Sequence, residues 1–152
     1  MKKVSVILMM ILLLVLLFGG LSAAEKDAAG CKDHPLIPRI KDYYIAGCSK
    51  GAATFDADMA NGKSETVHIE GSSTALMYSP QPELKSKPSE LQLRSNFENA
   101  VKNQGGTLVA TTPGQKWPVY KIVKDGKEFW IVLMVNSGKY FTGSYAYRIV
   151  EK

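Results

Sequence analysis

The chain has 152 residues, a formal net charge of +5 and two cysteines. Lys2 and Lys3 lie in an N-terminal targeting segment, so only about +3 of that charge belongs to residues 25–152. These residues contain no cluster of lysines and arginines with interleaved aromatic residues, which argues against nucleic acid as a partner. Their number suits a single domain with its own hydrophobic core.

The first 24 residues have the three zones of a secretory signal peptide. A positively charged start is followed by the apolar run from Val4 to Phe18, and Ser22-x-Ala24 supplies the small residues that signal peptidase prefers. The apolar run is shorter than the ~20 residues that a membrane-spanning helix needs. We therefore expect cleavage after Ala24, an exported domain over residues 25–152, and no transmembrane span after cleavage.

The segment Ala28-Ala29-Gly30-Cys31 resembles a site at which lipoproteins are processed and acylated on cysteine. Charged residues from Glu25 to Asp27 separate it from the apolar run, and burying them at the membrane surface would be costly. Lipidation of Cys31 is therefore the less favoured alternative to ordinary cleavage. Because an exported chain with two cysteines favours a bridge, we expect a disulfide between Cys31 and Cys48.

The first half of the mature chain is rich in residues that favour β-strands. Four short strands are predicted, over residues 42–48, 53–59, 65–70 and 74–79. Asn61-Gly62 marks a tight hairpin, and Gly71-Ser72 marks a second turn. Val67 and Ile69 alternate with polar residues, which predicts one buried and one solvated face. The strands are expected to form an antiparallel meander.

One helix is predicted after the proline-containing connection from Pro80 to Pro88. Ser89 is a suitable N-cap residue, and Gln92 completes a capping box. Four apolar residues then recur at helical spacing: Leu93, Phe97, Ala100 and Val101. Gly105-Gly106 ends the helix. The pattern indicates an amphipathic helix that packs on a sheet.

The chain returns to strands after the helix, over residues 107–111, 119–124, 128–135 and 139–150. Asp125-Gly126 and Ser137-Gly138 predict tight turns between the last three. Residues Phe129 to Val135 are apolar on both alternating faces, as expected for a central strand. The order of elements predicts an α+β domain, with a mostly antiparallel sheet of about six to eight strands and one helix packed on it.

The residues that could take part in catalysis or metal binding do not form a recognisable site. Four of them are ligand types that zinc prefers: Cys31, His34, Cys48 and His68. Their spacing lacks two close pairs, and export favours oxidised thiols. Asp56 and Asp58 share one strand face, which is more typical of a solvated face than of paired catalytic carboxylates. We expect no metal, no cofactor and no catalytic residue; a hydrolase or metal enzyme that uses His34 or His68 is the less favoured alternative.

Aromatic residues are concentrated on the predicted strands. Most should lie in the core, but neighbours such as Phe129 and Trp130 point to opposite faces of the sheet, so some are expected to remain partly exposed. An exposed aromatic patch suits contact with a protein, a glycan or a lipid. The candidates for partner contact are Trp117, Trp130, Tyr140, Tyr145 and Tyr147.

Three parts of the mature chain carry a family resemblance. They are Gly30–Leu36 with Arg39, Tyr43-Tyr44-Ile45 and Cys48; Ser89–Ala100 with Gly105-Gly106-Thr107; and Tyr147–Lys152. Together they resemble the N-terminal domain of certain OmpA-family (OmpA/MotB-type) envelope proteins. The resemblance implies an envelope location, an α+β accessory domain and a Cys31–Cys48 pair, and it implies no catalytic activity. The family's C-terminal peptidoglycan-binding module has no counterpart among these segments.

These features favour a non-catalytic periplasmic or outer-membrane-associated domain. We expect it to bind another envelope protein, a glycan or a lipid through its sheet or loops. A periplasmic domain that binds a small ligand or lipid, in a pocket between the helix and the sheet, is the alternative.

Overall fold

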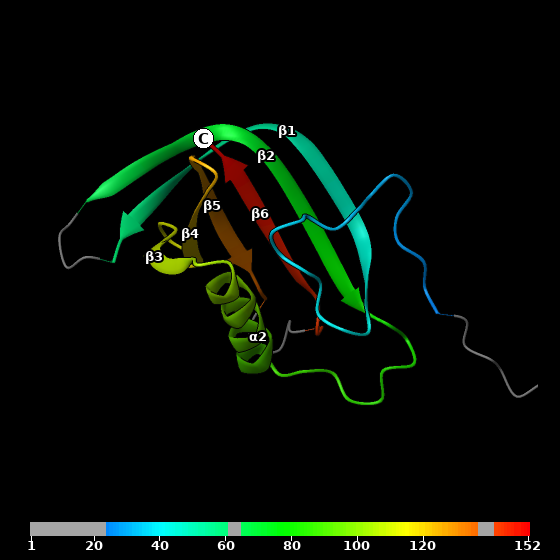
Figure 1. Ribbon diagram of the computed structural model, residues 1–152. Helices are drawn as coiled ribbons and strands as arrows, with labels where there is room; N and C mark the ends of the chain where they lie inside the picture. The colour runs from blue at the N-terminus through cyan, green and yellow to red at the C-terminus, as the bar shows by residue number, and fades with distance from the viewer. Residues whose placement is uncertain (1–23, 61–64, 137–141) are drawn as a thin grey trace, which may run out of the picture.

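The computed structural model describes residues 24–60, 65–136 and 142–152. The described chain contains, in order, β1 (Tyr43–Met59), β2 (Thr66–Pro80), α2 (Glu90–Asn103), β3 (Thr107–Thr111), β4 (Pro118–Lys124), β5 (Lys127–Met134) and β6 (Tyr145–Glu151) (Figure 1). The predicted α+β class, with an antiparallel sheet and one helix, is confirmed. The predicted signal peptide up to residue 23, the Asn61-Gly62 turn and the Ser137-Gly138 turn lie outside the described residues.

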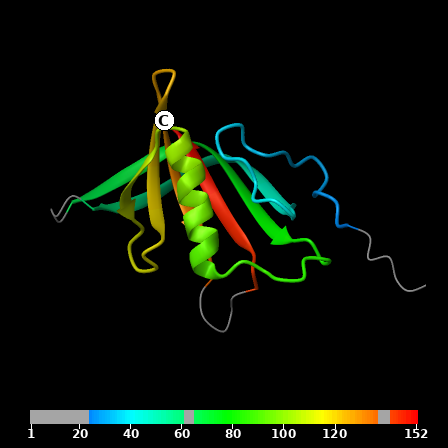
Figure 2. The ribbon, with the colours of Figure 1, turned by 60° about the horizontal axis from the view of Figure 1, so that its bottom comes forward.

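The six strands form one antiparallel sheet that closes on itself in the order β1-β2-β6-β5-β4-β3. β1 and β2 form a long hairpin, and β3 to β6 follow one another as a meander that ends beside β2. α2 connects β2 to β3 (Figure 2). The pairing that closes the sheet is short, because β3 and β1 are joined by two residue pairs, Asp58↔Thr111 and Met59↔Ala110.

The N-terminal hairpin is longer than the sequence predicted. Four short strands were expected, but β1 and β2 are continuous and pair from Tyr43↔Pro80 to Asp58↔Thr66. The predicted turn at Gly71-Ser72 is therefore wrong. A Cβ atom on Gly71 would overlap the backbone carbonyl of Glu151, so glycine is needed there for a close approach of β2 to β6.

A β-bulge in β1 changes which of its residues face each side of the sheet. The pairing of β1 with β2 shifts by one residue between Ile45 and Gly47. An extra residue reverses the alternation of side chains along a strand. Ile45 therefore lies on the same side as α2, whereas Phe55 and Ala57 lie on the opposite side.

Each face of the sheet carries its own hydrophobic cluster. The larger cluster lies between the sheet, α2 and the residues that precede β1. The smaller cluster lies on the other side, and its buried members are Ala57, Ile69, Ala110, Val119, Trp130, Val132 and Val150. β5 supplies alternate residues to both clusters, so the prediction of a central strand that is apolar on both faces is confirmed.

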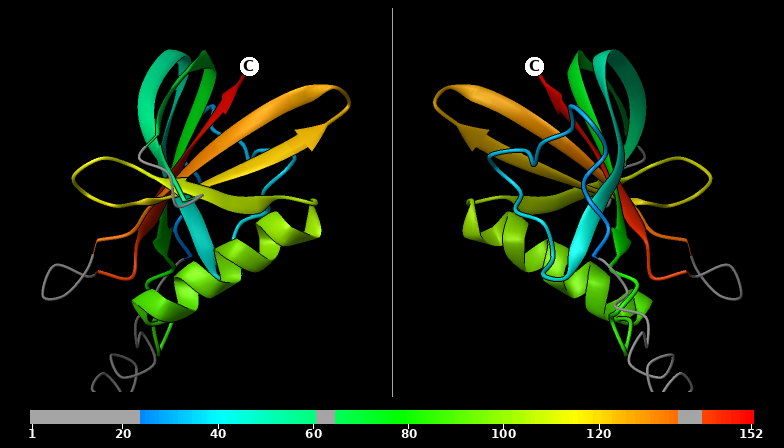
Figure 3. Two further views of the ribbon diagram at one scale, coloured as in Figure 1. Left: turned by 90° about the vertical axis from the view of Figure 1, so that its left-hand side faces the viewer. Right: turned by 90° about the vertical axis from the view of Figure 1, so that its right-hand side faces the viewer.

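α2 begins as the sequence predicted. Ser89 Oγ accepts the backbone N–H of Gln92 at 3.2 Å, and Gln92 Oε1 accepts that of Ser89 at 2.8 Å. The helix buries Leu93, Phe97 and Val101, one turn apart. Figure 3 shows α2 running along one side of the sheet, so its apolar stripe covers only part of that face.

We predict that Gly71→Ala lowers the free energy of unfolding by about 1–3 kcal/mol, the usual cost of overpacking. The added Cβ would overlap the backbone of Glu151, which β6 holds in register with β2. Gly47→Ala is the matched control, because its Cβ would meet Met77 Cε at an ordinary 3.8 Å. Urea unfolding of both variants measures the difference; equal stabilities would contradict this account of Gly71.

Candidate functional site

A disulfide joins Cys31 to Cys48 and thereby ties the segment before β1 to β1 itself. The two Cα atoms are 5.8 Å apart, and the cysteines are 17 residues apart in sequence. The predicted bridge is confirmed. Both cysteines of the chain are used in it, so neither offers a thiolate to zinc or a thiol for acylation. We call residues 24–42 the N-terminal arm.

Arg39 fixes the N-terminal arm at a second place. Its guanidinium contacts the carboxylates of Asp27 at 2.7 Å and Asp33 at 2.8 Å. Asp27 also accepts the backbone N–H of Ile45, and Asp33 accepts the hydroxyl of Tyr78, each at 2.8 Å. The hydrogen bonds from Arg39 are the main cause that lowers the pKa of Asp27. Charge-assisted bonds therefore connect the arm to β1 and β2.

Four tyrosines lie beneath the arm: Tyr43, Tyr78, Tyr145 and Tyr147. The ring of Tyr78 stacks on those of Tyr145 and Tyr147, with centroids 4.9 and 5.9 Å apart. Tyr145 Oη accepts the backbone N–H of Ile40 at 3.2 Å, and Tyr147 Oη donates to the carbonyl of Ile37 at 3.3 Å. Burial is the main cause that raises the pKa of Tyr147 to about 12, so this hydroxyl remains a donor at neutral pH.

The aromatic residues predicted to contact a partner are mostly buried. Trp130, Tyr145 and Tyr147 are 5%, 3% and 0% exposed, so the expectation that they form an exposed patch is wrong. Both faces of the sheet are covered, which leaves these rings in the two clusters. Trp117 is partly buried against the smaller cluster, and contact with a partner there stays a prediction. Tyr140 lies outside the described residues.

A cleft of about 440 Å³ opens where the N-terminal arm meets the turn between β4 and β5. We call it the arm cleft. Its apolar lining comes from Pro35 and Leu36 of the arm and from Phe129 of β5. Its polar lining consists of His34, Lys124, Asp125, Lys127 and Glu151. An apolar surface with a few polar groups is the usual composition of a binding site.

His34 is placed in the arm cleft by its own turn. Its Nδ1 accepts the backbone N–H of Leu36 at 3.3 Å, so the neutral ring carries its proton on Nε2. The ring meets Phe129 edge to face, with centroids 6.4 Å apart. Partial burial is the main cause that lowers the pKa of His34; Glu151 opposes this effect and Lys50 adds to it. A neutral His34 therefore offers one N–H donor beside the cleft.

Two lysines flank the β4–β5 turn at the arm cleft. Lys127 forms an ion pair with Glu151 at 2.6 Å. Lys124 instead donates to the side-chain amide of Gln104 at 3.4 Å. Among the described residues no carboxylate lies within ion-pair distance of Lys124, so its ammonium group is available to an anionic group of a ligand.

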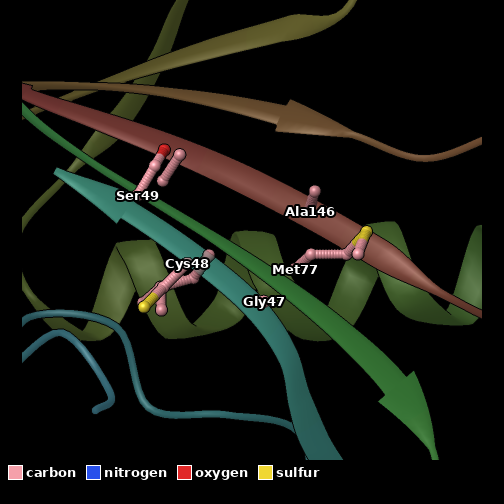
Figure 4. Close-up of a pocket in the computed structure, with 7 residues that line it drawn as sticks. Gly47, Cys48, Ser49, Met77 and Ala146 are labelled. Carbon is pink, nitrogen blue, oxygen red and sulfur yellow. The ribbon is translucent and has the colours of Figure 1, made fainter. Parts of the chain in front are cut away.

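A second hollow of about 260 Å³ lies on β1, β2 and β6. Figure 4 shows Ser49, Met77 and Ala146 on the face of these strands that is turned away from α2. The hollow is lined mainly by small or apolar side chains, so it lacks the charged groups that distinguish the arm cleft.

Asp56, Asp58 and His68 lie on the surface and contact other side chains there. His68 Nδ1 contacts Asp56 at 2.7 Å, and Asp58 contacts Lys116 at 3.1 Å. Over residues 24–60, 65–136 and 142–152 no three His, Cys, Asp or Glu side chains gather in a way that could hold a metal ion. His34 lines the arm cleft, whereas His68 pairs with Asp56 on the long hairpin, so the structure gives the two histidines separate surroundings.

The arm cleft was not predicted from the sequence. Its lining comes from the arm, the β4–β5 turn and the end of β6, which are far apart in the chain. The available signals were the prolines around His34 and the Asp125-Gly126 turn, but neither indicates that the two loops meet.

Comparisons with protein-family models, with curated proteins and with solved structures find no match to this chain. In the part of the chain that the structure describes, no helix combines the length and apolar character needed to cross a membrane.

We predict that His34 makes the protein less stable as the pH falls. Its pKa in the folded protein lies below the ordinary value of 6.5, so the unfolded chain takes up a proton first. Stability that is present above the ordinary pKa is then lost as the pH falls toward the folded pKa.

His34→Asn tests this, because asparagine keeps an acceptor near the position of Nδ1 but does not titrate. Urea unfolding of the wild type and the variant at about pH 7 and pH 5 gives the pH dependence of each. Between these two pH values, the free energy of unfolding should fall less in the variant than in the wild type. An equal loss in both proteins would show that His34 contributes nothing to it.

Proposed function

We propose that the protein is an exported, non-catalytic accessory domain of the bacterial cell envelope that binds another envelope component, whether a protein, a glycan or a lipid. The signal-peptide pattern supports export. The Cys31–Cys48 disulfide is consistent with export, because such bridges persist in oxidising compartments. The resemblance to the N-terminal domain of OmpA-family proteins supports an envelope location.

The arm cleft is the observation that carries this proposal. The disulfide and the Arg39 ion pairs fix the arm before any ligand binds, which reduces the entropy lost on binding. Pro35, Leu36 and Phe129 offer apolar contact, while Lys124 and His34 offer N–H donors. This combination suits an envelope component with an apolar part and an anionic or hydroxyl-bearing part.

A domain that binds a small ligand or lipid is the second candidate. The volume of the arm cleft, about 440 Å³, falls within the ~300–1,000 Å³ typical of small-molecule sites. The space between α2 and the sheet, where the sequence suggested a pocket, is occupied by buried side chains; Phe97 lies 5.4 Å from Tyr147 by ring centroids. A small ligand would therefore occupy the arm cleft.

We predict that a photo-crosslinking amino acid at Lys124 captures one envelope component when the protein is exported in cells. Lys124 lines the arm cleft and makes no ion pair in the described chain. The matched control carries the same amino acid at Leu91, which is 74% exposed on α2, away from the arm cleft. Adducts separated by gel electrophoresis and identified by mass spectrometry are compared between the two positions.

Three outcomes separate the candidates. A defined macromolecular adduct at Lys124 that is missing at Leu91 supports the accessory domain. A bound compound in native mass spectra, lost on Lys124→Glu, with no macromolecular adduct favours the small-ligand domain. The same mixture of adducts at both positions, with no bound compound, would contradict binding at the arm cleft.

A further inference from the structure

The outer edge of β1 is unpaired over about half of its 17 residues. β1 pairs with β2 along one edge, whereas β3 reaches the other edge at Asp58 and Met59. The N-terminal arm covers the start of that edge, where Ala28 N–H donates to the carbonyl of Ile45 at 2.8 Å. Among the described residues no strand pairs with the edge between Ser49 and Ala57 (Figure 1).

We propose that two copies of this chain pair through this free edge, β1 against β1, about a twofold axis at Ala53. Unpaired N–H and C=O groups on an edge strand are a template for pairing with another strand. A twofold axis perpendicular to the sheet makes the two β1 strands antiparallel and the interface self-complementary. With the axis at Ala53, Ser49 of one copy faces Ala57 of the other, so the whole free edge is used.

Charge complementarity supports this register. Lys50 of one copy faces Asp56 of the other, and the twofold axis repeats the pair. Both side chains are exposed, and they lie on the same face of β1 because their positions differ by an even number. Asp56 uses Oδ1 to contact His68, which leaves Oδ2 for the lysine of the second copy. Opposite charges that face each other across strands stabilise the pairing.

Side-chain size supports the same register. Gly51 of one copy faces Phe55 of the other, and Phe55 is only partly buried against the smaller cluster. An aromatic ring opposite a glycine covers the backbone that the glycine leaves bare. Ala53 faces itself at the axis, where its small side chain permits close approach.

Neighbouring registers that keep the same faces together fit less well. An axis at Thr54 would place Lys50 opposite Asp58, but Asp58 already pairs with Thr111 of β3 and contacts Lys116 at 3.1 Å. An axis at Ala52 would place Lys50 opposite Thr54 and would remove the charge pair.

Sedimentation velocity of the mature protein over a concentration series tests the proposal. We expect a reversible equilibrium between monomer and dimer. Lys50→Asp and Asp56→Lys each place like charges opposite one another twice, and each should weaken dimerisation roughly tenfold. The combined variant restores two opposite-charge pairs and should recover the dimer. A general loss of folding would not be recovered in this way.

Ala53→Cys tests the register directly. Facing residues in antiparallel strands have Cα atoms about 4.5–5.5 Å apart, within reach of a disulfide. The oxidised variant should run as a covalent dimer on a non-reducing gel, whereas Val123→Cys, which is 62% exposed on β4, should not. A protein that stays monomeric at every concentration would overturn the proposal. So would a dimer whose dissociation constant is unchanged by the charge variants and that forms no disulfide at Ala53→Cys.

Discussion

The N-terminal arm covers the part of the sheet that α2 leaves open. α2 buries Phe97 and its neighbours against the tyrosine rings, and the arm buries Leu36 and Ile37 in the same cluster. Fully burying a side chain of that size contributes roughly 1.5–3 kcal/mol. The disulfide adds on the order of 3 kcal/mol by restricting the unfolded chain. Because the arm forms one wall of the arm cleft, the same contacts that complete the core also shape the candidate binding site.

The β-bulge in β1 decides which of its residues reach each hydrophobic cluster. Without the extra residue, Phe55 and Ala57 would face the same side as Ile45; with it, they join the smaller cluster on the opposite side. β1 then meets β3 at Asp58 and Met59 alone among the described residues, and its edge before them is left unpaired. The bulge therefore fixes which side of the sheet each residue of β1 faces, and the short pairing of β3 with β1 leaves the free edge.

Local interactions could be predicted from the sequence, whereas long-range ones, apart from the disulfide, could not. Ser89 and Gln92 bond to each other across one helical turn, so the start of α2 follows from their spacing. The turn predicted at Gly71 is wrong because a glycine in a strand can mark either a turn or a close approach, and only its contact with Glu151 decides between them. The arm cleft could not be predicted, since His34 meets the β4–β5 turn only when the sheet has closed. The paired cysteines were the one long-range constraint that composition made visible.

Hydrogen–deuterium exchange of the oxidised and reduced protein tests most directly whether the disulfide holds the arm in the core. The backbone N–H groups of Ala28, Cys31 and Ile37 are hydrogen-bonded within the arm or to β1. We expect reduction to speed their exchange strongly while amides of β4 and β5 stay slow, because local opening of the arm would precede unfolding of the sheet. Unchanged exchange in the arm, or an equal increase throughout the sheet, would contradict this account.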